Sequence, residues 1–120
     1  HIEVSPVKYT ELNQSAAAES SQEIRLRILA ARKIQQQRYL DTGLHANAHM
    51  SRKQVEAFCQ LSPESQKMLQ SAMKKLGLSA RAYERILKVA RTIADLDASP
   101  MISTAHLSEA IQYRNLDRSN

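Results

Sequence analysis

Residues 78–96 carry the clearest hydrophobic pattern in the chain. At 100° per residue, apolar positions fill one half of a helical wheel and polar positions fill the other half. The apolar half holds Ala82, Tyr83, Ile86, Leu87, Val89, Ala90, Ile93, Ala94 and Leu96. The polar half holds Arg81, Glu84, Arg85, Lys88, Arg91, Thr92 and Asp95. An apolar face this wide predicts a central helix that packs against more than one neighbouring helix.

Start and stop signals for further helices surround this segment. Ser20 with Glu23, and Ser51 with Gln54, have the spacing of capping boxes, in which each side chain accepts a hydrogen bond from the other residue's backbone. Gly77 suits the end of the helix that precedes the central one. Together these signals predict helices over residues 21–40, 52–60, 62–76, 78–97 and 104–114. The predicted fold class is therefore all-α, a small bundle of about four or five helices.

The first predicted helix and the two chain ends complete this organisation. Ile24, Ile28, Ala31 and Ile34 are spaced to form a buried stripe on the first helix. Residues 1–7 alternate apolar and polar positions like a strand, which has no partner in a helical chain. We therefore expect an extended segment and linker over 1–20, a helical domain over 21–114 and a frayed tail over 115–120.

Composition narrows the class of protein. The chain has 42% hydrophobic residues but only 4% aromatic ones, so its core must be aliphatic and rich in alanine. A single cysteine excludes an intrachain disulfide and fits a cytoplasmic protein. No apolar run approaches the roughly 20 residues that span a membrane, so we expect no membrane partner. The net charge of +5 favours polyanionic partners such as nucleotide phosphates or nucleic acid. The chain starts with His1, which suggests a piece of a longer protein.

The motifs expected of an independent ATPase are missing from the sequence. With two glycines in the chain, no phosphate-binding G-x-x-x-x-G-K-[ST] loop can be written. No acidic pair follows a strand, where it could hold Mg²⁺. His45 and His49 have a spacing that binds metal on helices, with Cys59 as a third donor, but they fall in a predicted loop without a fourth ligand. We expect no metal site, and no enzymatic activity from this chain alone.

Arg81 is the candidate functional residue. It falls in the first turn of the central helix, where the helix dipole disfavours a cation by up to about 1 kcal/mol. Arg81 is therefore either solvated or placed to receive a phosphate together with the helix start. Arg85 and Lys88 continue its stripe, either as further phosphate contacts or as ordinary solvated charges. Arg91 and Asp95 have the spacing of a surface ion pair worth a few tenths of a kcal/mol.

The segments GLSARAYERILKVARTIADL and HLSEAIQYR resemble the C-terminal part of magnesium-chelatase-like AAA+ ATPases, most closely the competence-associated ComM type. The resemblance implies that the chain is the helical lid of such an ATPase, and that residues 1–20 include a remnant of the core's last strand. The family's S-x-R step falls on Ser79, Ala80 and Arg81. It implies that Arg81 is the sensor-2 arginine, which reaches the γ-phosphate of ATP, with Arg85 as a further candidate contact.

The same resemblance implies the setting of the parent protein. The parent would be an ATPase that binds ATP and Mg²⁺ in the AAA+ core of the same chain. Its subunits would form a ring, expected to be a hexamer. For the ComM type the expected work is on DNA, as a helicase or branch-migration motor in competence and recombination. For magnesium chelatases it is metal insertion into a porphyrin, and the sequence leaves open which substrate applies. It also leaves open whether Arg81 acts on its own subunit's ATP or on a neighbour's.

A second interpretation is an independent helical domain that binds nucleic acid. Its basis is the basic first helix, which carries Arg25, Arg27, Arg32, Lys33 and Arg38. However, these cations are spread around the helix, and we identify no aromatic platform on which bases would stack and no clear glycine turn of a helix-turn-helix motif.

Overall fold

The computed structural model of the chain describes residues 19–119, with side chains described as far as residue 114. This part is helical and contains no strand, which confirms the all-α class. The expected extended segment over residues 1–20 lies, apart from its last two residues, outside the described part. The elements are α2 (Ser21–Arg38), the 3₁₀ turn η1 (Asn47–His49), α3 (Arg52–Phe58), α4 (Pro63–Leu76), α5 (Ala80–Leu96) and α6 (Thr104–Ser119).

Local capping sets where the helices begin. At the start of α2, the Glu23 backbone N–H donates to Ser20 Oγ at 3.1 Å, and the Ser20 N–H donates to the Glu23 carboxylate at 2.7 Å. Ser51 and Gln54 form the same reciprocal pair at the start of α3. Gly77 ends α4 in the left-handed conformation, with φ of 61°, which costs a residue without a Cβ little. The capping signals in the sequence are thus confirmed.

Two helix ends differ from the sequence-based expectation. Helix α2 ends at Arg38 rather than at residue 40, because the next residue, Tyr39, turns into the core and is only 3% exposed. Helix α6 continues to Ser119 rather than ending at Arg114. Neither glycine nor proline occurs after Pro100, so the local sequence offers no strong stop signal.

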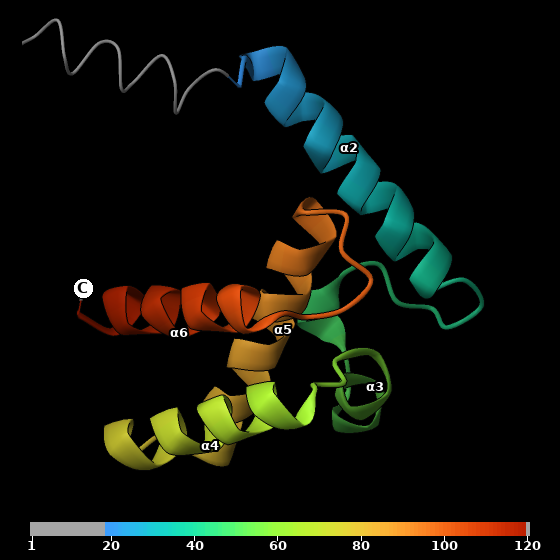
Figure 1. Ribbon diagram of the computed structural model, residues 1–120. Helices are drawn as coiled ribbons and strands as arrows, with labels where there is room; N and C mark the ends of the chain where they lie inside the picture. The colour runs from blue at the N-terminus through green and yellow to red at the C-terminus, as the bar shows by residue number, and fades with distance from the viewer. Residues whose placement is uncertain (1–18, 120) are drawn as a thin grey trace, which may run out of the picture.

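Helix α5 is the centre of the fold. It contacts α2, η1, α3 and α6, while α4 packs against α6, and Figure 1 shows α4 and α6 crossing α5 steeply. Its buried apolar residues are Ala82, Ile86, Leu87, Ala90 and Ala94. They meet Leu69 of α4 and Leu107 of α6, both fully buried, in one core cluster. The predicted central helix is confirmed, although Ile93 is half-buried rather than fully buried.

The buried stripe expected on α2 is wrong. Of its four residues only Ala31 is buried, at 4% exposure, whereas Ile24 and Ile28 are 42% and 40% exposed. On the other side of the helix, Leu26 and Leu29 are 58% and 50% exposed. Figure 1 shows the reason, because α2 runs away from the other helices and only its C-terminal half reaches them. All of residues 21–30 are exposed.

Candidate functional site

The N-terminal end of α5 is open and carries the candidate arginine. Ser79 Oγ accepts a hydrogen bond from the Ala82 backbone N–H at 3.2 Å and so caps the helix. Arg81 is exposed in the first turn. Its guanidinium forms no hydrogen bond or ion pair with any residue that the structure describes. The first turn of a helix has backbone N–H groups without intrahelical partners, so Arg81 stands beside further donors suited to an anion.

The other two cations of the stripe follow Arg81 along α5. Arg85, one turn on, is exposed, and Lys88 is half-buried. The Lys88 ammonium donates to the Ala48 carbonyl at 3.2 Å, which ties α5 to η1. The structure therefore keeps Arg81 and Arg85 accessible and gives Lys88 a partial structural role. A phosphate contact by Arg81 or Arg85 remains a prediction.

The C-terminal end of α5 holds a buried ionic network around Asp95, which is 1% exposed. Arg38 of α2 donates to both carboxylate oxygens of Asp95, from Nη1 at 2.8 Å and from Nη2 at 2.6 Å. Arg91 Nε donates to Oδ1 at 3.1 Å, and Asn47 Nδ2 donates to Oδ2 at 3.0 Å. One carboxylate thus joins α2, η1 and α5, and the paired bonds from Arg38 fix its orientation as well as its position.

Two arginines shift the protonation equilibrium of this carboxylate. Burial alone would raise the pKa of Asp95, but hydrogen bonds from Arg38 and Asn47 and the charges of Arg38 and Arg91 outweigh it, so the pKa lies below its usual value. The hydrogen bond and charge of Asp95 in turn raise the pKa of Arg38, against the effect of burial. Asp95 is therefore ionised at neutral pH and cannot serve as a proton donor.

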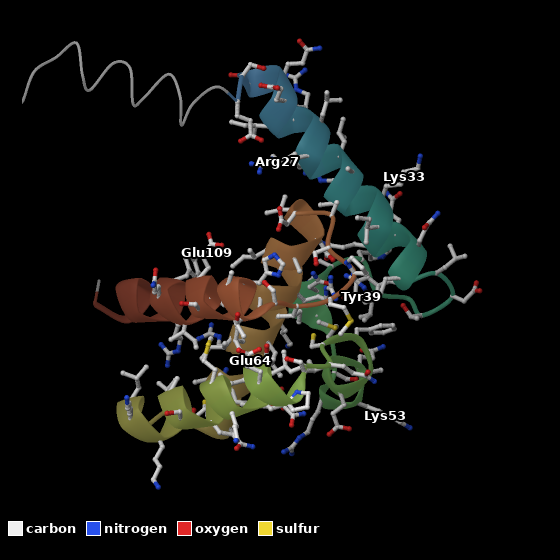
Figure 2. All side chains as sticks on the ribbon, in the orientation of Figure 1. Arg27, Lys33, Tyr39, Lys53, Glu64 and Glu109 are labelled. Atoms are coloured by element: carbon white, nitrogen blue, oxygen red, sulfur yellow. The ribbon has the colours of Figure 1, made fainter. Side chains whose placement is uncertain are left out.

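The network reaches beyond its ion pairs. The Arg91 guanidinium donates to the carbonyls of Ser99 at 2.7 Å and Pro100 at 3.1 Å, and so closes the loop between α5 and α6. Asn47 Oδ1 accepts from Arg38 and from the hydroxyl of Tyr39. Figure 2 shows Tyr39 where α2 ends beside α3, at the junction that this network stabilises.

The i,i+4 ion pair expected between Arg91 and Asp95 is confirmed, but it does not lie at the surface, where it would be worth only a few tenths of a kcal/mol. They are paired, but both are buried, with Arg91 4% exposed and Asp95 1% exposed. The reason is that α2, η1 and the α5–α6 loop cover this side of α5 and bring their own polar partners. The wheel could not show Arg38, which lies 57 residues from Asp95 in the chain. A partial signal was present, because Ala90 and Ala94 beside them are small enough to let other segments approach closely.

The remaining histidines and the cysteine have structural roles or lie apart. His106 Nδ1 accepts from the Ser103 backbone N–H at 3.0 Å, so its Nε2 proton faces Asp97 at 2.9 Å. His106 thus helps to cap the start of α6, where its own backbone N–H also donates to Ser103 Oγ at 3.2 Å. Within residues 19–114, no group of three potential metal ligands comes together. Cys59 is buried, and burial raises the pKa of its thiol to about 11.

Membrane insertion finds no support in the described helices. None of those between residues 19 and 119 combines the length and the apolar character needed to cross a bilayer.

Comparison with known proteins identifies the family of the chain. Residues 18–114 match the family model described as magnesium chelatase, subunit ChlI C-terminal. Over 106 residues, 88% of the chain, it is 42% identical to competence protein ComM of Haemophilus influenzae. Over 100 residues it is 43% identical to a protein named YifB of Escherichia coli, and over 108 residues 39% identical to YifB of Salmonella typhimurium. The matched region spans 20%, 19% and 21% of these curated relatives, about a fifth of their length. The chain therefore belongs to the family of magnesium chelatase ChlI C-terminal domains, as found in ComM- and YifB-type proteins.

Proposed function

We propose that this chain is the lid domain of an AAA+ ATPase and that Arg81 contacts the γ-phosphate of ATP bound by the rest of the parent protein. The observation that carries the proposal is the state of Arg81, which is exposed and unpaired within the described residues at the open start of the central helix. A cation held there without an anion is electrostatically unfavourable. The same position supplies the sensor-2 arginine in the resembled family.

The rest of the ATP site belongs to the parent protein. This chain offers a guanidinium and a helix start but no phosphate-binding loop. ATP and Mg²⁺ would therefore be held by the AAA+ core, within a ring of subunits expected to be a hexamer. Lid movement would then couple hydrolysis to mechanical work. Arg85 is a second candidate contact, because it is exposed on the same stripe one turn later.

DNA is the proposed substrate of the motor. One relative is named a competence protein. This name supports a role in competence over metal insertion into a porphyrin. The activity that we propose for the parent in that setting is that of a helicase or branch-migration motor. The chain supplies the nucleotide-sensing part of that motor.

The ATP proposal is tested in the full-length parent protein. Arg81→Ala should reduce the ATP turnover number about 10²- to 10³-fold, the effect of removing one preorganised donor to a developing charge. The melting temperature should stay unchanged or rise slightly. Arg85→Ala and Lys88→Ala are the controls, with smaller losses of turnover. Normal turnover combined with a lowered melting temperature in Arg81→Ala would make Arg81 a structural residue and reject the proposal.

The isolated chain provides a second check on the same proposal. It should not hydrolyse ATP, and it should bind ATP weakly at best, because one arginine and a helix start provide no pocket for the base or ribose. Isothermal titration calorimetry measures this directly. Sub-micromolar affinity of this chain alone for ATP would contradict a lid that depends on a separate core.

A further inference from the structure

An open hollow of about 340 Å³ lies between α5 and α6. Three cationic side chains line it, Arg85 and Lys88 from α5 and Arg114 from α6. Tyr113 of α6 also lines the hollow. Ile86 and Ala110, which are both buried, form its apolar floor. No acidic side chain is among the described residues that line this α5–α6 hollow. Among the described residues, the lining of the hollow is therefore positively charged.

Each of the three cations keeps capacity for a further partner. Arg85 is exposed and forms no ion pair with the residues that the structure describes. The Lys88 ammonium donates one hydrogen bond to the Ala48 carbonyl, and two of its three donors remain for a ligand. Arg114 is half-buried, and its Nε is shielded from solvent without a hydrogen-bond partner in the described part of the chain. Three positive charges facing one hollow attract a ligand with more than one negative charge.

The aromatic ring narrows the class of ligand. Tyr113 is 60% exposed, so much of its ring is accessible to a ligand. Cations that track phosphates beside an aromatic ring on which bases stack are the combination that binds single-stranded nucleic acid. An acidic peptide would use the cations but not the face of the ring. A duplex keeps its bases stacked inside, so it cannot place one on Tyr113.

We propose that the α5–α6 hollow binds one nucleotide unit of a single-stranded nucleic acid. The base stacks on Tyr113, and the flanking phosphates pair with Arg85, Lys88 and Arg114. The site differs from the one that the sequence suggested, since Arg38 of α2 is committed to Asp95. Arg27 and Lys33 also point to different sides of α2 (Figure 2). Neither Arg81 nor bound ATP is needed for this site.

The test is fluorescence anisotropy of labelled oligothymidylate with this chain at several salt concentrations. Neutralising the two phosphates that flank one nucleotide predicts that the logarithm of affinity falls with the logarithm of salt with a slope of about −1.4. Tyr113→Ala should weaken binding about tenfold without changing that slope, because stacking is lost and no charge is removed. Tyr113→Phe keeps the ring and should bind normally. Arg85→Glu should weaken binding and make the slope shallower by about 1.

Arg25→Glu is the matched control, because it makes the same change in net charge on the exposed part of α2, outside the hollow. It should change affinity less than twofold. Circular-dichroism melts establish that each variant is folded. Equal losses from Arg25→Glu and Arg85→Glu, with Tyr113→Ala silent, would reduce the binding to diffuse charge attraction and overturn the proposal. So would tighter binding of a duplex of equal length, or no binding at 50 mM salt. The assay contains no ATP, so its outcome is separate from that of the Arg81 experiment.

Discussion

The two ends of α5 carry the same residue type in opposite states. At the N-terminal end Arg81 and Arg85 are exposed, and at the C-terminal end Arg91 is buried among a carboxylate and two carbonyls. The difference lies in what the neighbouring segments supply, because α2, η1 and the α5–α6 loop surround only the C-terminal end. An arginine can be buried only where it is fully paired. The arginine at the C-terminal end of α5 is therefore used to hold neighbouring segments, whereas the arginines at the N-terminal end remain available to ligands.

The paired end acts through specificity more than through net stability. A buried ion pair often stabilises a fold no more than a well-packed apolar pair would, yet removing one partner leaves a buried charge uncompensated. The Asp95 network therefore ties α2 and the α5–α6 loop to α5 in one arrangement. The exposed side chains of the open end, Arg81 and Arg85, contribute little to the fold, so substituting them should affect binding more than stability.

The largest effect is expected from removing the carboxylate at the paired end. Asp95→Ala leaves the half-buried Arg38 and the buried Arg91 without their shared partner and should lower the free energy of unfolding by about 3–5 kcal/mol. Urea denaturation measures it. Glu84→Ala, near the open end, is the control, because its contact with Arg52 is long at 3.7 Å and the Arg52 side chain is 78% exposed. That variant should lose less than about 1 kcal/mol. Equal losses at both sites would remove the contrast between the two ends.

A conservative substitution applied to both ends sharpens the contrast. Arg91→Lys keeps the charge but cannot reach Asp95, Ser99 and Pro100 together, so it should cost about 1–3 kcal/mol. Arg85→Lys at the exposed position should stay within about 0.5 kcal/mol of the wild type. Thermal unfolding of the two variants under one condition gives the comparison. A tolerated Arg91→Lys would mean that charge alone, rather than the planar fork of donors, holds the network.

Acid should weaken the paired end selectively. The pKa of Asp95 is lower in the folded state than in the unfolded state, so its contribution is fully present above the unfolded value of about 3.9. That contribution is lost as pH falls through the folded value. Urea denaturation of wild type and Asp95→Asn is measured from pH 7 to pH 3. The free energy of unfolding should be higher for the wild type at neutral pH, and the difference between the two proteins should shrink as the pH falls. A gap independent of pH would show that Asp95 does not titrate as described.

The smallest effect is expected at the open end. Arg81→Ala in this chain removes a cation from the positive end of the helix dipole and should leave stability unchanged or raise it by up to about 1 kcal/mol. Thermal unfolding at low ionic strength is the sensitive measurement. Marked destabilisation would give Arg81 an intramolecular partner and would make the two ends of α5 alike.

Local signals predicted local structure well. Ser20 and Ser51 marked helix starts, Gly77 marked a helix end, and the apolar half of α5 marked the core, because caps and helix periodicity depend on neighbours within a few residues. The exposure of Ile24 could not be read in this way. An apolar stripe indicates that a face can be buried, whereas whether another helix covers it depends on the path of the chain.

The candidate sites also differ in how far the sequence could predict them. Arg81 could be proposed from the sequence because its unfavourable position is local to one helix turn. The Asp95 network and the α5–α6 hollow could not, since each joins residues from elements far apart in the chain. Tyr113 and Arg114 could be recognised as parts of a binding site only from the structure, which places α6 beside Arg85 and Lys88.

Helix α2 is held at its C-terminal end by the two hydrogen bonds from Arg38 to Asp95, and its N-terminal part projects away from this support. The exposed residues 21–30 form a free beam of about 15 Å at 1.5 Å per residue. Because Ser21 lies about 26 Å from Arg38 along the helix, a tilt of about 10° at the support would displace the tip by about 4.5 Å, and a push on the tip would return as torque on the C-terminal end of α5. Because two parallel hydrogen bonds resist rotation where a single contact would act as a pivot, the joint transmits bending and not merely tension.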